Sequence, residues 1–338
     1  MVIAILVVVI VVLGISLVYV LVTPRAGGPT AAPTVVRMGI SPWSSLSSMR
    51  KLYPEISDMW DSLETKYNIK WDWIITEEDA STLFYGGSDF AVLGPLETAE
   101  MVFNRGFQAY NFGNIVWNED ACVVRGDSPY QKVTDLLGKK LANFGYDSGA
   151  YKYAETLWAH EYGIDASEDF EWVVAPPDVC IELLNKGEVE AALVYGGPWA
   201  VGLHDYGMRL LYGPYTEEAK RLLGRPAAAI EGMMIRKDLA DAHPEVPKAI
   251  LEAWTNIYNF MAKDPIGIYD AFLGESYGLN PEQAATFRSI YPFEKHMAKP
   301  EPLTDAQIAA DMQIIQWAYQ HGIIENPPSD NIFLKVQM

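Results

Sequence analysis

A pattern of Gly, an acidic residue, an apolar run and then Gly-Pro occurs twice, in residues 87–95 and 187–198. In each copy a helical segment is expected to end at the first Gly and another to begin after the Pro. Gly adopts the left-handed conformation that ends helices, and Pro lacks an N–H that the first helical turn does not use. The apolar runs, Phe90–Leu93 and Ala191–Tyr195, are too short for helices. They are typical of strands covered on both faces in a parallel α/β sheet.

This repeat also predicts where a ligand would bind. Ligands of open α/β sheets bind outside the carboxyl ends of the strands. Here both carboxyl ends are Gly-Pro turns, where a ligand can approach the backbone closely. Two such units in one chain therefore predict two lobes that face one cleft.

The composition indicates a globular protein and argues against a nucleic-acid partner. The chain has 338 residues, of which 50% are hydrophobic, and a formal net charge of −19. This length is sufficient for two domains with cores of their own. No cluster of Lys or Arg is present to neutralise phosphates.

The N-terminal segment 1–22 is almost wholly Val, Ile and Leu and carries no charged side chain. As a helix it is long enough to span a bilayer. The charged start of a signal peptide is missing, which favours an uncleaved membrane anchor, although a removed signal and a secreted protein stay an alternative. Residues 23–34, rich in Pro, Thr, Gly and Ala, are expected to form an extended stalk. In both cases we expect the remainder to be extracytoplasmic.

The only two cysteines are Cys122 and Cys180. A disulfide is allowed outside the cell, whereas Cys180 beside Leu183 and Leu184 favours burial as a free thiol. Both possibilities stay open. Neither cysteine has a nearby His, so no zinc site is predicted, and no other metal or cofactor is expected.

Two strands echo each other at the predicted lobe boundaries. Val123–Asp127 and Met234–Asp238 each contain an apolar run, Arg, and then Asp two residues later. We therefore predict a lobe made of residues 35–124 and 230–338, interrupted by a second lobe of residues 125–229. The two chain crossings would form a hinge.

Four segments together resemble a known family, the type II periplasmic substrate-binding proteins. Within it, the chain is most similar to the nitrate, sulfonate and taurine binding proteins and the thiamine-precursor binding proteins of ABC importers. The segments are Gly87–Pro95, Arg125–Lys140, Gly187–Pro198 and Met233–Pro244.

The resemblance implies a small solute clamped between two lobes and delivered to an ABC permease and its ATPase, with no chemistry of the protein's own. The chain departs from many bacterial members because it has an apolar segment and stalk instead of a lipidated Cys. That departure suits a cell without an outer membrane, such as an archaeon. An enzyme of the menaquinone or thiamine-precursor type on the same scaffold is the alternative, and a ligand-sensing ectodomain is a third.

The resemblance also places ligand contacts at the strand ends and helix starts that face the cleft. We predict no catalytic or metal-binding residue among them. The corresponding positions in this chain are Ser41, Trp43, Gly94, Pro95, Glu97, Tyr146, Asp147, Ser148, Tyr195, Trp199 and Glu231.

Each of these positions also has a purely structural explanation. The two Gly-Pro pairs suit turns, and Trp43 and Trp199 suit either an aromatic wall around a flat ligand or packing between the lobes. Asp147 and Ser148 suit the N-cap of a helix.

The acidic residues bear on the class of ligand. Glu97 and Glu231 are either solvated surface acids or part of the cleft. If they line the cleft, they and Asp147 favour an amine, an amidine or a metal-bearing ligand over a simple anion. A zwitterion such as taurine, or a pyrimidine-like solute, fits this pattern best.

Overall fold

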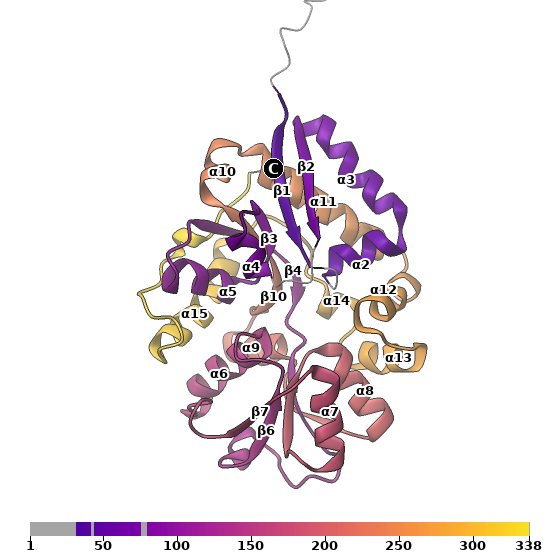
Figure 1. The fold of residues 1–338 in the computed structure, drawn as a ribbon, viewed down its shortest axis with the longest axis vertical. Helices are drawn as coiled ribbons and strands as arrows, with labels where there is room; N and C mark the ends of the chain where they lie inside the picture. Colours follow the sequence, from indigo (N-terminus) through magenta and orange to yellow (C-terminus); the bar gives the residue numbers. More distant parts are fainter. Residues whose placement is uncertain (1–31, 42–43, 76–79, 338) are drawn as a thin grey trace, which may run out of the picture. The chain divides into compact units, whose positions relative to one another are not determined.

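The computed structural model describes residues 32–41, 44–75 and 80–337, whose strands form two five-stranded sheets (Figure 1). Sheet A has the order β2-β1-β3-β10-β4, and sheet B has the order β7-β6-β8-β5-β9. The strands of sheet A are β1 (Thr34–Ile40), β2 (Ile69–Ile75), β3 (Phe90–Val92), β4 (Ala109–Trp117) and β10 (Ala229–Arg236). Those of sheet B are β5 (Ala121–Val124), β6 (Lys140–Asn143), β7 (Glu171–Val174), β8 (Ala191–Val194) and β9 (Arg209–Tyr212).

Both apolar runs of the repeated pattern are strands, as predicted, but the sheets are mixed. β3 pairs in parallel with β1 and antiparallel with β10. β8 likewise pairs in parallel with β6 and antiparallel with β5. The parallel pairing expected of these runs therefore occurs on one side of each strand, and the pairing on the other side is antiparallel. The antiparallel partner of each run is one of the two echoing strands, so the same arrangement recurs in both sheets.

Helices cover the sheets, and their boundaries follow the Gly and Pro signals. α5 begins with Pro95 after Gly94, and α7 ends at Gly187, whose φ is 74°. The helix that was predicted to begin after Pro95 consists of α5 followed by a π-helix, Glu100–Asn104. The other helices are α2 (Ser45–Leu52), α3 (Pro54–Tyr67), α4 (Ala80–Tyr85), α6 (Gly149–Tyr162), α8 (Gly196–Tyr206), α9 (Tyr215–Leu223), α10 (Lys237–Ala242), α11 (Glu245–Met261), α12 (Gly267–Tyr277), α13 (Pro281–Ile290), α14 (Phe293–His296) and α15 (Asp305–Gln320), with α5 spanning Pro95–Ala99 and α7 Pro177–Lys186.

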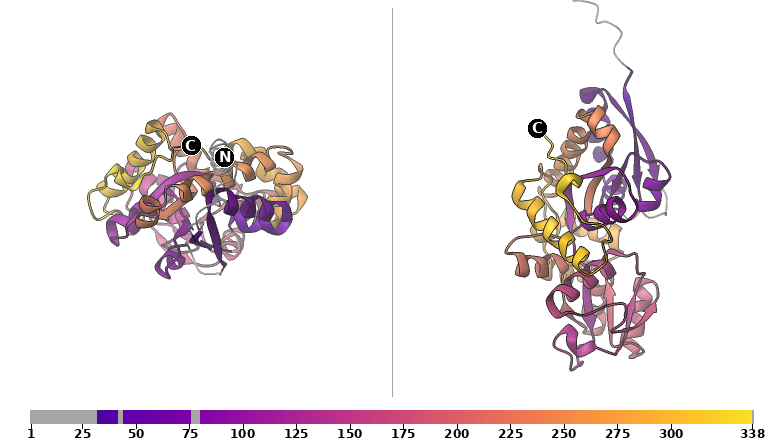
Figure 2. Two further views of the ribbon diagram at one scale, coloured as in Figure 1. Left: turned by 90° about the horizontal axis from the view of Figure 1, so that it is seen from above. Right: turned by 90° about the vertical axis from the view of Figure 1, so that its left-hand side faces the viewer.

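C-terminal helices connect the layers around the two sheets. α15, yellow in Figure 2, packs against both α5 and α6, and α13 packs against α8. Residues 35–338 accordingly form one compact unit.

The chain passes between the sheets twice. Residues 118–120 join β4 of sheet A to β5 of sheet B, and residues 213–228 return from β9 to β10. The two crossings are bonded to each other, because the Asn118 N–H donates to the carbonyl oxygen of Ala228 at 3.1 Å and the Tyr215 N–H donates to that of Asp120 at 3.0 Å. β5, which we assigned to the first lobe, thus pairs within sheet B.

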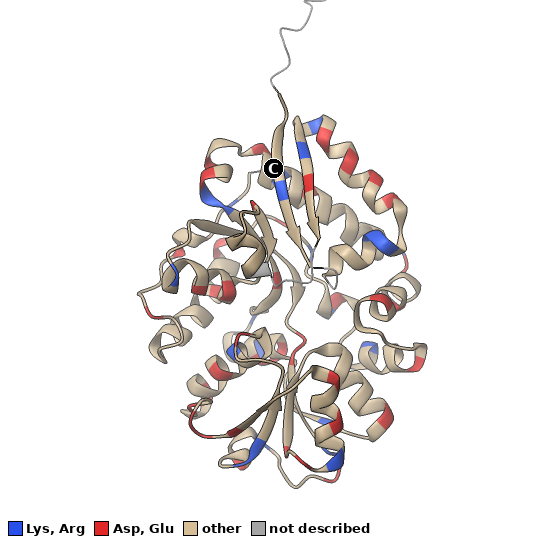
Figure 3. Cartoon of the chain, viewed as in Figure 1, with Lys and Arg blue, Asp and Glu red and all other residues tan. Residues whose placement is uncertain are grey.

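Cys122 and Cys180 are both buried free thiols, which answers the question that the sequence left open. Lys and Arg are scattered over the described residues in Figure 3. No helix within the described ranges is long and apolar enough to cross a bilayer. The predicted anchor, residues 1–22, lies outside those ranges.

Candidate ligand-binding cavity

A cavity of about 540 Å³ lies between the two sheets, and we call it the intersheet cavity. Its volume falls in the range typical of sites for small organic ligands. Sheet A supplies Val116, Ile230 and Glu231, whereas Phe144 and Tyr195 directly follow β6 and β8 of sheet B. The carboxyl ends of two strands thus open onto the cavity, as expected for this class of sheet. The remaining lining residues are Glu119, Asp120, Gly149, Pro177, Ser276 and Tyr277.

The first chain crossing places two buried carboxyl groups at this cavity. Glu119 is 4% exposed and Asp120 is 2% exposed. The Tyr277 hydroxyl donates a hydrogen bond to Glu119 Oε1 at 2.7 Å. Burial, together with the neighbouring charges of Glu119 and Glu97, raises the pKa of Asp120 well above its usual range.

The second crossing leads to Glu231, whose carboxylate accepts hydrogen bonds from the start of α2. The Ser45 N–H donates to Glu231 Oε1 at 3.2 Å, and the Ser45 hydroxyl donates to Oε2. An anion at this position is also favoured by the positive end of the helix dipole. Burial nevertheless raises the pKa of Glu231 to about 7.

Three aromatic rings, those of Phe144, Tyr195 and Tyr277, also line the cavity. The ring centroids of Phe144 and Tyr195 lie 5.8 Å apart, and those of Tyr195 and Tyr277 also lie 5.8 Å apart. Edge and tilted contacts of this kind hold rings in fixed orientations. The cavity therefore combines aromatic rings with buried carboxyl groups.

The predicted Gly94, Pro95 and Glu97 do not line the intersheet cavity. Gly94 permits a close approach instead, because a Cβ there would lie 2.1 Å from the carbonyl oxygen of Ala229. Pro95 is the buried first residue of α5. Glu97 faces an adjoining pocket of about 410 Å³, where its Oε2 accepts no hydrogen bond and burial raises its pKa to about 7.

The predicted helix start at residues 146–148 lies at the edge of the site. The Ser148 hydroxyl oxygen caps α6 by accepting from the Tyr151 N–H at 3.2 Å. The Asp147 side chain is 95% exposed and lies 3.8 Å from Lys152 Nζ. Tyr146 is 51% exposed, and its ring packs edge-on against Tyr151.

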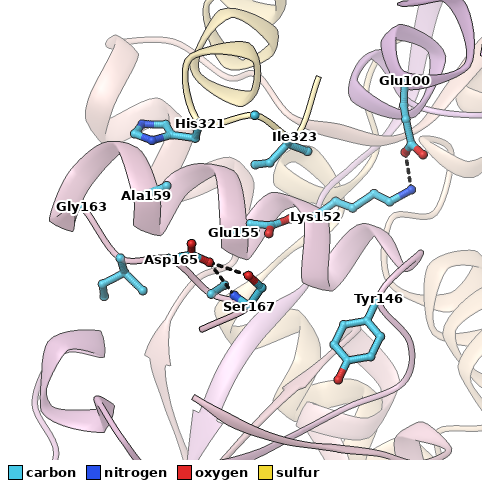
Figure 4. Close-up of a pocket in the computed structure, with 13 residues that line it drawn as sticks. Glu100, Tyr146, Lys152, Glu155, Ala159, Gly163, Asp165, Ser167, His321 and Ile323 are labelled. Atoms are coloured by element: carbon cyan, nitrogen blue, oxygen red, sulfur yellow. Dashed lines mark hydrogen bonds and ion pairs between the residues drawn. The ribbon is translucent and has the colours of Figure 1, made fainter. Parts of the chain in front are cut away.

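Tyr146 lines a separate groove of about 430 Å³ beside α6 (Figure 4). Figure 4 shows that two of the acids there have partners within the protein: Glu100 contacts Lys152, and Asp165 accepts two hydrogen bonds from Ser167. Neither crossing of the chain contributes to this groove. It is therefore a weaker candidate for a ligand than the intersheet cavity.

Trp199 is placed differently from Tyr195, although both belong to the second copy of the repeat. Tyr195 lines the intersheet cavity, and its contact with a ligand stays a prediction. Trp199 is fully buried, stacks on Phe287 at a centroid distance of 4.8 Å, and donates from Nε1 to the Glu119 carbonyl oxygen at 2.9 Å. This position differs from our expectation of a ligand contact, because the ring fills the space between α8 and α13.

The Gly-Gly-Pro turn before Trp199 is explained by close packing. A Cβ on Gly196 would lie 2.8 Å from Glu119 Cγ, and a Cβ on Gly197 would lie 2.8 Å from Tyr277 Cβ. Distances this short do not occur between real Cβ atoms and such neighbours. The turn thus allows two of the cavity residues, Glu119 and Tyr277, to approach α8.

Ser41, a predicted ligand contact, directly follows β1. The carbonyl oxygen of Ser41 accepts from the Ser44 N–H at 3.1 Å and from the Ser47 hydroxyl at 2.7 Å, so it forms the turn into α2. Trp43 lies outside the residues that the structure describes. A ligand contact by either residue stays a prediction.

Sequence reasoning missed Glu119, Asp120 and Tyr277. A signal for the first two existed, because two adjacent acids stand directly before the apolar run of β5, close to the predicted lobe boundary. Tyr277 carried no comparable signal. It is the last residue of α12, and only the tertiary fold brings its hydroxyl to Glu119.

Solved structures with a similar arrangement of elements include two sulfonate-binding proteins. The aliphatic sulphonate binding protein SsuA of Escherichia coli matches with a TM-score of 0.66 and 17% identity, over 87% of this chain and 94% of its own. The alkanesulfonate-binding protein SsuA of Xanthomonas axonopodis pv. citri, bound to MOPS, also matches with a TM-score of 0.66, at 18% identity over 89% and 96%. This chain has a periplasmic-binding-protein fold.

The same fold also carries enzymes. The desulfurization enzyme DSZB matches with a TM-score of 0.57 at 12% identity, over 87% of this chain and 94% of its own. No protein-family model matches the sequence, and no curated protein is significantly similar to it. Identities this low show a common fold, so the function must be argued from the cavity itself.

The raised pKa values of Glu97 and Glu231 predict how stability depends on pH. Both carboxyls have a pKa of about 7 in the folded chain, against 4.5 when unperturbed. Between these values the folded state holds protons that the unfolded state has lost, so their contribution to stability falls as the pH rises through this window.

We therefore expect the double variant Glu97→Gln and Glu231→Gln to gain stability relative to wild type as the pH rises from about 5 to about 8. Urea unfolding of both proteins across this range measures the difference. A difference that stays constant with pH would show that the two carboxyls titrate normally.

Proposed function

We propose that this chain is the extracytoplasmic solute-binding protein of an ABC importer. The observation that carries the proposal is the intersheet cavity, which is lined by residues of both sheets and of the first chain crossing. The similar folds of the two SsuA proteins, whose names describe them as sulfonate-binding, support the same role.

In this role the two lobes predicted from the sequence would open and close about the crossings. A solute that contacts Glu231 from sheet A and Tyr195 from sheet B touches both sides of the cavity. Such a solute stabilises the closed form by contacts that the open form cannot make. The closed form would then be recognised by an ABC permease, with its ATPase as a further partner.

The N-terminal segment completes the proposal. Residues 1–22 would anchor the protein in the cell membrane, and residues 23–34 would hold the binding unit away from it. The solute would be a small organic molecule, either taurine-like or pyrimidine-like, released chemically unchanged.

A thermal-shift screen of the full chain tests this function, because a ligand that binds only the folded state raises the melting temperature. The screen covers alkanesulfonates, taurine, nitrate, bicarbonate and aminopyrimidines. We expect at least one class to stabilise the protein, and mass spectrometry to recover the solute unchanged. Recovery of a converted product would favour an enzyme of the DSZB kind instead.

Tyr195→Ala tests whether binding occurs in the intersheet cavity. Removal of its ring takes away part of the aromatic wall, so the affinity for the solute is expected to fall by about tenfold or more. Tyr206→Ala is the matched control, because Tyr206 ends the same helix, is 44% exposed and does not line this cavity. Equal affinities of the two variants would place the binding site elsewhere.

A further inference from the structure

The intersheet cavity is lined by acidic residues, with no basic residue to balance them. Glu119, Asp120 and Glu231 all reach its surface, whereas no Lys, Arg or His belongs to its lining. In their charged forms these three groups would repel an anion, whereas a cation among them would favour the charged forms over the protonated ones, and the low dielectric of a buried site strengthens both effects. The cavity therefore lacks a basic side chain that would balance the negative charge of a simple sulfonate.

Glu119 adds a second, independent observation. Its side chain is 96% buried, since its exposed fraction is 4%. Oε1 accepts from the Tyr277 hydroxyl, but Oε2 accepts no hydrogen bond from the protein. A buried carboxylate oxygen without a donor is costly, and a ligand N–H would satisfy it.

A basic side chain, His296, is fully buried next to Glu119 but does not line the cavity. Its Nε2 lies 3.6 Å from Glu119 Oε2, beyond hydrogen-bond distance. Its ring nitrogens lie 2.7 Å and 3.2 Å from the hydroxyls of Tyr269 and Tyr277.

We propose that the solute carries a protonated amine or amidine nitrogen, which lies among Glu119, Asp120 and Glu231. Its carbon skeleton lies against the rings of Tyr195 and Tyr277, which can also attract the cation through their faces. This inference rests on the proposed function, because it names the solute class of the same cavity. A metal ion fits less well, since no described group of three His, Cys, Asp or Glu is arranged to hold one.

Three helix starts at the cavity, in contrast, favour an anionic group. The first residues of α6 and α7, Gly149 and Pro177, and the N-cap of α8, Tyr195, line the cavity. Helix starts attract anionic or carbonyl oxygens. A zwitterion could therefore place its acidic end there and its nitrogen among the carboxylates, so the nitrogen is the feature that the test must isolate.

Matched pairs of solutes isolate that nitrogen. Taurine is compared with 2-hydroxyethanesulfonate, benzylamine with benzyl alcohol, and benzamidine with benzamide, by thermal shift and calorimetry on the full chain. We expect the member of each pair that carries a cationic nitrogen to bind at least about tenfold tighter than its partner. This panel is then extended to further amines and amidines, each compared with a neutral or anionic counterpart.

Two variants then locate the cation. Glu231→Gln and Asp120→Asn keep the shape of each side chain and remove its charge, so each is expected to weaken the cation by about tenfold or more. Asp127→Asn is the matched control, because its side chain is 89% exposed and lies outside the cavity. Its affinity is expected to equal that of wild type.

The outcomes separate this inference from the proposed function. Binding of 2-hydroxyethanesulfonate or another anion as tight as its amino partner would overturn the cation while leaving solute binding intact. Cation binding that Glu231→Gln and Asp120→Asn leave unchanged would also overturn it. If no member of the extended panel binds, both the inference and the solute-binding function are contradicted.

Discussion

Replacement of Trp199 by alanine is expected to lower the free energy of unfolding by about 3–5 kcal/mol, the usual cost of removing a fully buried Trp. The indole is completely buried and stacks on Phe287 with an angle of 10° between the rings. Its Nε1 also donates to the Glu119 carbonyl oxygen. The substitution would leave a large void between α8 and α13 and free the segment that carries Glu119.

Trp199→Phe is the matched control for this prediction. Phenylalanine retains the stacking and most of the volume but loses the hydrogen bond, so a loss of about 1 kcal/mol is expected. Urea unfolding measures both variants. If Trp199→Ala were as stable as wild type and only its ligand affinity fell, Trp199 would be a ligand contact, as the sequence first suggested.

Replacement of Gly94 by alanine is expected to cost about 3 kcal/mol in the free energy of unfolding, because the added methyl group has no space. Its Cβ would lie 2.1 Å from the Ala229 carbonyl oxygen and 2.8 Å from Glu97 Oε2. The first contact is with backbone, so no rotamer change relieves it. The φ of −68° at Gly94 suits alanine, which means that the cost is steric.

The same variant is expected to weaken solute binding as well. Ala229 directly precedes Ile230 and Glu231, so a shift of β10 away from α5 moves two residues of the cavity. Gly86→Ala is the matched control, since the nearest atoms to its Cβ would lie at 3.4 Å. Unfolding and thermal-shift measurements on both variants test the prediction, and equal stability of the two would refute the close approach.

Local sequence signals predicted the strands and the helix ends well. The apolar runs became β3 and β8, and Gly187 ends α7 in the left-handed conformation that Gly favours. These features depend on a few neighbouring residues, and the sequence contains those residues directly. The mixed pairing did not follow from the same signals, because β5 and β10 join their sheets from distant parts of the chain.

The candidate site was predictable only in part. Tyr195 and Glu231 line the intersheet cavity, and both were expected at strand ends or starts that face the cleft. Glu119 and Tyr277 were not expected, because their meeting depends on how α12 packs against the first crossing.

Trp199 shows the limit of reasoning from residue type. A Trp after Gly-Pro suits a binding wall and a buried core equally well, and the packing partner Phe287 lies far along the chain. Its burial was therefore decided by tertiary packing. The preference for a cationic solute, in contrast, rested on acids near the cleft, and the structure adds Glu119 and Asp120 to that group.

A crystal structure of the full chain with the tightest amine or amidine from the panel tests the central claim most directly. We predict that the solute lies between sheets A and B, with its nitrogen about 3 Å from carboxylate oxygens of Glu119, Asp120 or Glu231. A solute in the groove beside α6, or one whose nitrogen points away from all three carboxylates, would contradict the account.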